Sequence, residues 1–224
     1  MNTEVVKPMY GWNTLAWKEI ERSVFKLQKR IYQAEQRGNV KTVRKLQRLM
    51  MKSWYAKLLA TRRVTQDNQG KKTAGIDGIK ELSQAQRLEM AQNLEISEKA
   101  KPVRRVWIPK PRKDEKRPLG IPVMQERATQ ALVKMALEPQ WEARFEPNSY
   151  GFRPGRSPQD AIDAIFTGIC RRPKYALDAD ISKCFDCIDH KALLRKIQAS
   201  PKLSKQIKAW LKAGVMYKGE LFPT

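Results

Sequence analysis

Apolar side chains recur at alternating spacings of three and four between residues 14 and 36, which predicts an amphipathic helix with one buried stripe. The stripe consists of Trp17, Ile20, Val24, Leu27, Ile31 and Ala34. Gly38-Asn39 provides a stop and a turn. A second helix is predicted from about Val40 to Arg63, and its inward-facing positions are Val43, Leu46, Met50 and Trp54. We expect the two helices to pair as an antiparallel helical hairpin.

The rest of the chain alternates between loops, helices and short β-prone runs. Residues 64–80 are rich in Gly, Asn, Asp and Lys and predict an exposed loop. Ser83 and Gln86 then form a predicted capping box that opens a helix to about Ile96. Later elements are a hairpin with strands at 103–109 and 118–121, helices at 124–137, 158–170, 191–199 and 203–213, a strand entering Asp180, and a hairpin at 215–222. This mixture predicts an α+β fold with a small antiparallel sheet.

Charge changes this picture by indicating a partner. The chain carries 45 Lys and Arg against 23 Asp and Glu, a formal net charge of +22. Residues 1–63 hold 15 of the bases and 4 of the acids, so the predicted helical hairpin contributes half of the excess from little more than a quarter of the length. Any single lysine there is explained by a solvated helix face. The whole segment favours contact with RNA or DNA.

Two classes of protein are disfavoured by composition. No apolar run approaches the length of a membrane span, so no membrane partner is expected. Three cysteines do not form a disulfide framework in a chain of this size, which favours a reducing intracellular setting.

Four acids cluster in the fifteen residues ALDADISKCFDCIDH, residues 176–190, after a short β-prone run. A carboxylate at the end of a buried strand is costly unless a cation meets it, and Mg²⁺ held by carboxylates and substrate phosphates is one solution. Asp180 is the candidate ligand, together with the carbonyl of Ile181 that follows it. Asp186 and Asp189 have plainer explanations, an ion pair and a helix N-cap. On spacing alone, both interpretations of Asp180 stay open.

A charged turn at residues 110–117 offers a second candidate site. Lys110 enters the turn and Arg117 leaves it, so the two cations can converge on one face of a hairpin and hold a triphosphate. The alternative is a charged, solvated turn, and the turn alone favours that alternative.

Cys184, Cys187 and His190 form a C-x-x-C-x-x-H triple. It is a weak zinc signal, because a structural zinc site requires four ligands and the sequence contains no second pair. Small buried thiols are the favoured interpretation, and His190 is expected to help begin a helix.

Several of these segments, taken in order, resemble the N-terminal part of a group II intron-encoded reverse transcriptase/maturase. The resemblance rests on LQKRIYQA, VRKLQRLMMKS, RRVTQDNQGKKTAGIDG, RRVWIPKPRKDEKRPLGIP, ALEPQWEARFEPNSYGFRPGRSPQDAI and ALDADISKCFDCIDH. It implies a right-hand polymerase with three parts. Residues 1–63 would form a basic RNA-binding extension, residues 64–170 the fingers, and residues 171–224 the beginning of the palm.

The same resemblance implies roles for individual residues. Asp180 matches the first palm carboxylate of a two-Mg²⁺ site, and Ile181 matches the residue whose carbonyl joins it. Phe185 matches the aromatic residue under the sugar that excludes a ribose 2′-OH. Lys110 and Arg117 match the fingers residues that grip the triphosphate of the dNTP substrate. Arg153 and Arg156 lie in the segment that resembles the template-contacting fingers motif. The implied partners are group II intron RNA, an RNA template with a DNA primer, and target DNA in the intact particle.

The sequence also departs from the family pattern. A Tyr-x-Asp-Asp turn completes the metal site in this family, and no such tetrapeptide is present. The sequence ends at LFPT, before the usual Pro-Gln-Gly segment. We therefore expect a fragment of a larger enzyme that does not polymerise DNA alone. Two functions remain: an RNA-directed DNA polymerase, or a non-catalytic splicing cofactor that binds intron RNA. A generic basic ribosome-associated protein would leave Asp180 and Phe185 unexplained.

Overall fold

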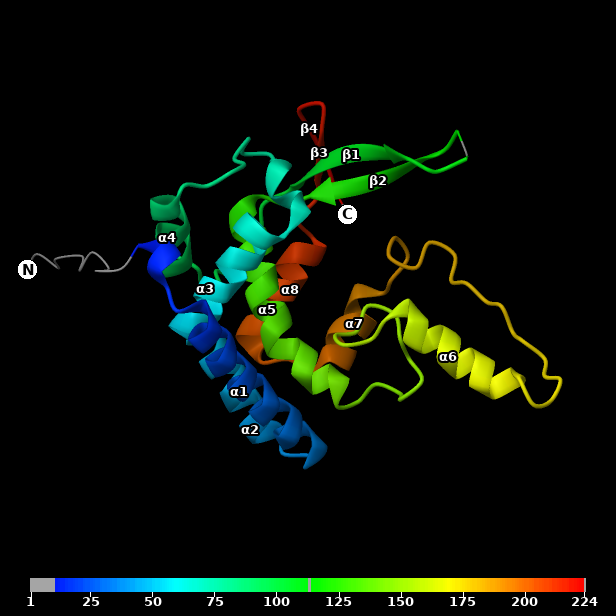
Figure 1. Ribbon diagram of the computed structural model, residues 1–224. Helices are drawn as coiled ribbons and strands as arrows, with labels where there is room; N and C mark the ends of the chain where they lie inside the picture. The colour runs from blue at the N-terminus through cyan, green and yellow to red at the C-terminus, as the bar shows by residue number, and fades with distance from the viewer. Residues whose placement is uncertain (1–10, 113, 224) are drawn as a thin grey trace, which may run out of the picture.

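The computed structural model describes residues 11–112 and 114–223, and it combines helices with one small sheet (Figure 1). The first ten residues of the predicted extension and residue 113 of the predicted turn lie outside the described residues. In chain order the elements are η1 Trp12–Thr14, α1 Trp17–Gln36, α2 Val40–Lys52, α3 Trp54–Arg62, η2 Arg63–Asp67, η3 Gln69–Lys72, α4 Gln84–Gln92, β1 Val103–Pro109, β2 Lys116–Ile121, α5 Met124–Glu142, α6 Pro158–Ile169, α7 His190–Ile197, α8 Pro201–Leu211, β3 Val215–Tyr217 and β4 Glu220–Phe222. The predicted mixed α and β class is confirmed.

The N-terminal helical hairpin forms as its hydrophobic pattern predicts. α1 and α2 pack side by side, and the turn between them contains Gly38 at a φ of +65°. Asn39 caps α2, since its side-chain oxygen accepts a hydrogen bond from the Thr42 N–H at 3.0 Å. The buried stripe of α1 is Ile20, Val24, Ile31 and Ala34.

The second predicted helix is wrong in its length, because it breaks into α2 and α3 at Ser53. Ser53 has an extended backbone, and its hydroxyl accepts a hydrogen bond from the Ala56 N–H. A serine that bonds to the backbone in this way stabilises a new helix start rather than a continuous helix. The break turns Trp54 outward, where 38% of its surface is exposed instead of buried as expected.

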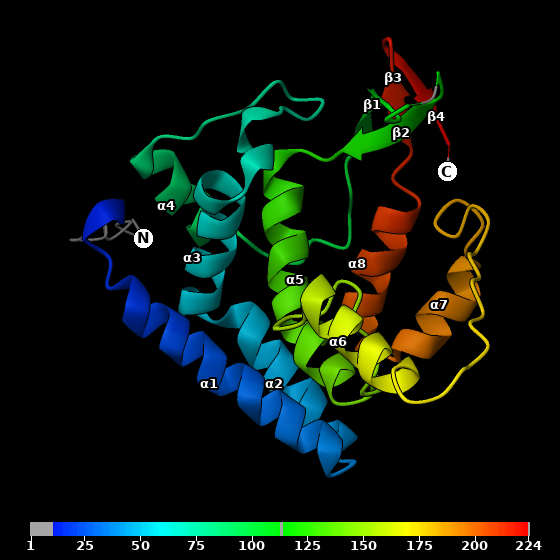
Figure 2. The ribbon, with the colours of Figure 1, turned by 45° about the vertical axis from the view of Figure 1, so that its right-hand side comes forward.

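α5 is the central helix, and α1, α2 and α3 all pack against it (Figure 2). One hydrophobic cluster joins the N-terminal helices to α5 through residues such as Ile31, Met50, Leu58 and Leu132. α5 is five residues longer than predicted, and it passes through Pro139, which is buried. The basic helical hairpin is therefore held rigidly against the middle of the chain.

The predicted capping box at the start of α4 is confirmed, with Ser83 and Gln86 each bonded to the other's backbone N–H. α4 ends at Gln92, short of the predicted Ile96. The predicted loop at 64–80 begins instead as the short helical turns η2 and η3. Gly75 then passes so close to Val123 that a Cβ on it would lie 2.6 Å from the Val123 Cα.

Four strands form one sheet in the order β2-β1-β3-β4. Both predicted hairpins are confirmed: β1 pairs antiparallel with β2, and β3 pairs antiparallel with β4. β1 and β3 are parallel, with Val103 opposite Val215, so the sheet is not purely antiparallel as predicted. Both views show the sheet projecting beyond the ends of α5 and α8 (Figures 1 and 2).

The predicted strand entering Asp180 is wrong. Residues 173–181 have no regular secondary structure, and Tyr175, Leu177 and Ile181 are 107%, 93% and 72% exposed. No strand among the described residues pairs with this segment, so its backbone cannot form the hydrogen bonds that make a strand stable. The neighbouring α6 forms as predicted but buries no residue. No helix of the described residues is long and apolar enough to cross a membrane.

Candidate functional site

The β1–β2 hairpin positions the two cations that the sequence predicts for a triphosphate. Ile108 lies opposite Arg117 in the strand register, and the Lys110 N–H donates to the Glu115 carbonyl at 2.9 Å, which continues the same ladder. Because residues two apart on a strand share a face, Lys110 and Arg117 project from the same face of the hairpin. The register thus brings the predicted pair together.

Lys110 and Arg117 differ in their surroundings. The Lys110 ammonium pairs with the Glu115 carboxylate, and this hydrogen bond and charge hold the pKa of Glu115 below its usual range. The Arg117 guanidinium is exposed and forms no ion pair with any described residue. An exposed ion pair contributes little free energy, so a triphosphate can compete with Glu115 for Lys110.

The acidic segment at residues 176–190 lies on the side of the molecule toward which the hairpin points (Figures 1 and 2). Asp180 Oδ1 accepts a hydrogen bond from the Ile181 N–H at 2.8 Å, and Phe185 is 88% exposed. Asp180, Ile181 and Phe185 therefore stand on an open segment rather than in an enclosed pocket. No three His, Cys, Asp or Glu side chains of the described residues gather closely enough to hold a metal ion.

Asp189 is confirmed as a helix cap. Its Oδ1 accepts hydrogen bonds from the N–H groups of Lys191 and Ala192 at 2.7 and 3.1 Å, at the start of α7. The bonds from Ala192 and Lys191 lower the pKa of Asp189. The cysteine prediction is wrong in one respect, since Cys184 and Cys187 are exposed rather than buried. The whole segment around them is open to solvent, so neither thiol has a core to enter.

The two arginines that are predicted to contact a template occupy different environments. Arg153 is only 7% exposed, and it binds Glu142 at 3.0 Å and the carbonyls of Glu146 and Ser149, both at 2.7 Å. The hydrogen bonds of its guanidinium therefore stabilise the turn after α5. Arg156 is exposed and lies over the Tyr150 ring, 5.4 Å from its centroid. Contact with a template remains a prediction for both, and only Arg156 presents its charge to solvent.

The structure also assembles a cationic pocket that sequence reasoning missed. It has a volume of about 440 Å³, and it lies between α2, α3, the segment after α4 and the start of α8. Four of its lining side chains are cationic and one is acidic: Arg48, Lys52, Lys57, Lys202 and Glu95. The bases of the helical hairpin were evident from the sequence. Lys202 was not, because it joins them across about 150 residues of chain.

Arg127 is a second residue that the sequence gave no reason to select. Its guanidinium donates to the carbonyls of Pro122, Gly70 and Thr73, so it ties the turn at 70–73 to the start of α5. Burial is the main cause that lowers its pKa. An arginine in a charged stretch carries no sequence signal for such a structural role.

Family comparisons agree with the order of these elements. Residues 108–223, which include the turn and second strand of the first hairpin, the acidic segment and the second hairpin, match the family described as reverse transcriptase (RNA-dependent DNA polymerase). The chain belongs to this family. Residues 12–94, which include the basic helical hairpin, match the N-terminal domain of reverse transcriptase.

Named relatives place the chain with the group II intron-encoded reverse transcriptases and maturases, which confirms the resemblance. Protein YkfC of Escherichia coli is 34% identical over 61% of this chain and 38% of its own length. Group II intron-encoded protein LtrA of Lactococcus lactis is 39% identical over 51% of this chain and 20% of its own length. Maturase-like protein 1 of Euglena gracilis is 30% identical over 84% of this chain and 42% of its own length. The chain thus spans between a fifth and about two fifths of these relatives.

Proposed function

We propose that the chain forms the nucleotide-gripping fingers and the first part of the palm of an RNA-directed DNA polymerase. In the intact protein it would copy an RNA template into DNA from a DNA primer by nucleotidyl transfer. The observation that carries the proposal is the β1–β2 register, which projects Lys110 and Arg117 from one face within a chain of the reverse transcriptase family. Two cations on one face can bind the charge of a dNTP triphosphate, Lys as a point charge and Arg as a fork.

The donor atoms at Asp180 suit a divalent metal in kind but do not complete a site. A carboxylate and a backbone carbonyl are the oxygen ligands that Mg²⁺ prefers. The described residues supply one such pair, Asp180 and Ile181, with no further carboxylate cluster around it. Within the right-hand arrangement we propose, Asp180 is one ligand among several, and Phe185 in the same segment contacts the sugar of the incoming nucleotide. The domain limits proposed are 1–63, 64–170 and 171–224.

Primer extension on an RNA template by the full-length protein tests the polymerase proposal. We expect Asp180→Ala to abolish extension and Arg117→Ala to raise the KM for dNTP more than it lowers kcat, because Arg117 binds the substrate rather than the reacting atoms. Two matched controls remove the same charge at a different position nearby: Asp186→Ala in the acidic segment and Arg112→Ala in the hairpin turn. Full activity of Asp180→Ala would refute the proposal.

A second function, binding of intron RNA as a splicing maturase, is favoured by the cationic pocket. Arg48, Lys52, Lys57 and Lys202 form no ion pair with a described residue, although Glu95 lies in the same pocket. Four cations that converge without neutralising partners attract a polyanion. α2 carries three more exposed bases, Lys41, Arg44 and Lys45. The N-terminal helices would then hold intron RNA while the fingers bind nucleotide.

Salt-dependent binding of intron RNA distinguishes this function from polymerase activity. Replacing Lys52 and Lys202 together by Ala removes two phosphate contacts, so the slope of log K against log salt should fall by roughly 1.4 to 1.8. Lys134→Ala and Lys205→Ala, which remove lysines already paired with Glu138 and Glu98, are the matched controls. An unchanged slope and affinity in the Lys52 and Lys202 double variant would contradict the assignment of this pocket.

A further inference from the structure

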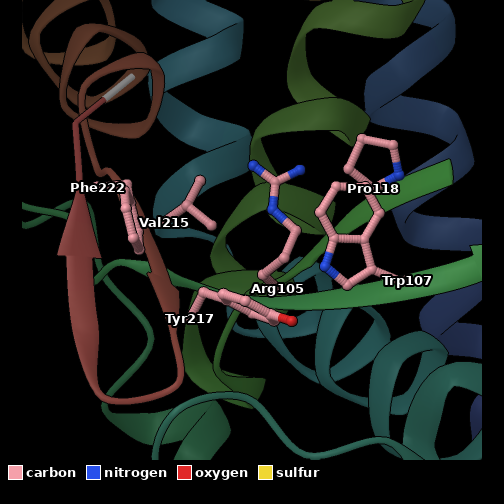
Figure 3. Close-up of a pocket in the computed structure, with 6 residues that line it drawn as sticks. All are labelled: Arg105, Trp107, Pro118, Val215, Tyr217 and Phe222. Atoms are coloured by element: carbon pink, nitrogen blue, oxygen red, sulfur yellow. The ribbon is translucent and has the colours of Figure 1, made fainter. Parts of the chain in front are cut away.

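A second pocket lies on the opposite face of the sheet from Lys110 and Arg117. It has a volume of about 320 Å³, and its lining residues come from all four strands: Arg105, Trp107, Pro118, Val215, Tyr217 and Phe222 (Figure 3). Trp107 lies opposite Pro118, and the Lys110 face carries the alternate residues of the same strand. The pocket is therefore separate from the surface proposed to grip the triphosphate.

Aromatic rings dominate this pocket and remain accessible. Trp107 is 46% exposed and Phe222 is 47% exposed, while Tyr217 is half-buried. The rings of Trp107 and Tyr217 meet edge to face with centroids 6.4 Å apart, so the two rings are not stacked face to face on each other. Accessible aromatic rings on a sheet surface are the platform on which single-stranded nucleic acids stack their bases.

Charge on this face favours a polyanion over an apolar protein segment. The Arg105 guanidinium lies 5.8 Å from the Trp107 ring and forms no hydrogen bond or ion pair with a described residue. The Lys218 ammonium lies 5.6 Å from the Tyr217 ring, and Lys116 lies opposite Pro109 on the same face. Glu220, opposite Tyr217, is the single acid that the strand register places among these three bases. Aromatic rings interleaved with unpaired cations fit bases joined by phosphates.

We propose that this pocket, lined by Arg105, Trp107, Tyr217 and Phe222, binds an unpaired base of single-stranded RNA, with Arg105 on the adjoining phosphate. The inference rests on the proposed function for its RNA, but it concerns a different surface from the triphosphate face and from the cationic pocket. The volume lies at the lower end of the range for ligand pockets, roughly 300 to 1,000 Å³, which suits one base rather than two.

Binding of a uridine-rich RNA strand by the 224-residue chain tests the pocket. Trp107→Ala should weaken binding roughly 5- to 150-fold, the range expected for loss of one stacked base, whereas Trp107→Phe should retain most of the affinity. Leu119→Ala is the matched control, since Leu119 is 43% exposed on the other face of the same strand pair. The same strand annealed to its complement should bind the wild type and Trp107→Ala equally, because its bases are already stacked.

The salt dependence of RNA binding distinguishes the contribution of the Trp107 ring from that of the Arg105 guanidinium. Trp107→Ala removes no charge, so it should leave the slope of log K against log salt unchanged. Arg105→Ala should lower that slope by about 0.7, the value for one phosphate contact on a single strand. If Trp107→Ala folds normally and binds the single strand as tightly as the wild type, the pocket is not an RNA site. An equal loss of binding to the duplex overturns the proposal as well.

Photocrosslinking of the wild-type chain to RNA that contains 5-bromouridine provides a test that needs no variant. Crosslinks on Trp107 or Tyr217 support the proposal, and crosslinks confined to α1, α2 or the Lys110 face overturn it. Self-association that Trp107→Ala abolishes also overturns it, since the occupant is then a second copy of the chain. Salt-sensitive RNA binding that is unaffected by Trp107→Ala refutes this inference alone, while complete absence of RNA binding refutes the proposed maturase function too.

Discussion

A buried pair of glutamines links the N-terminal helical hairpin to the central helix and gives a sharp test of the packing. Gln47 on α2 donates its Nε2 hydrogen to Gln140 Oε1 on α5 at 2.7 Å. The two side chains are 2% and 5% exposed. Removal of one partner leaves the other amide buried without a partner, which costs about 1 to 3 kcal/mol. Removal of both leaves no orphaned group and should be nearly neutral.

We therefore expect Gln47→Met and Gln140→Met each to lower the free energy of unfolding by about 1 to 3 kcal/mol. Methionine is unbranched and fills a similar volume, so neither change creates a large cavity. The double variant should recover most of the loss, which makes the coupling energy between the two sites similar in size to the sum of the two single effects. At this chain length each kcal/mol corresponds to a shift of about 2 to 4 °C in the melting temperature.

Urea denaturation followed by circular dichroism measures all four proteins of this cycle. Gln36→Met is a suitable control, because Gln36 bonds to Tyr32 on the exposed surface of α1. If the double variant loses the sum of the two single losses, the glutamines act independently and the reasoning is refuted. Salt-dependent RNA binding is a useful second measurement, since Gln47 is adjacent to Arg48 of the cationic pocket.

Three other perturbations follow from the contacts of the described residues. Arg127→Gln leaves carbonyls of the 70–73 turn without a donor, so hydrogen exchange should speed up in that turn and stability should fall by about 1.5 to 3 kcal/mol. Gly75→Ala forces a Cβ against the Val123 backbone and should lower the melting temperature, whereas Gly151→Ala, with open space around it, should not. Because the pKa of Asp189 is lowered, its carboxylate caps α7 fully at pH values above the ordinary Asp range, and the cap is lost as pH falls through the lowered pKa. The NMR shift of the Ala192 amide should therefore change in acid, and Asp189→Asn should remove that change.

Local patterns in the sequence were sufficient to predict most of the elements. The apolar stripe of α1, the capping box at Ser83 and the two hairpins depend on residues within one helix or one turn, and each is present. The break at Ser53 was missed because a serine within a helical pattern is compatible with either continuation or a cap, and only packing decides. The same distinction applies to the cations of the two proposed binding surfaces. Lys110 and Arg117 were predictable from one hairpin, whereas Lys202 joins the pocket of Arg48 only through the tertiary fold.

The acidic segment shows most clearly why local pattern has limits. A β-prone run is not a strand until another strand accepts its hydrogen bonds, and no strand of the described residues lies beside Asp180. α6 has regular helical hydrogen bonds but no packing partner for its apolar face among the described residues, where Ile162, Ile165, Phe166 and Ile169 are between 52% and 66% exposed. A single sheet would satisfy both features, with α6 packed on one face and residues 176–180 paired as one of its strands. It follows that Asp180 should gain its fixed position and its burial only when that sheet forms, and that metal affinity at Asp180 should rise together with protection of the α6 face.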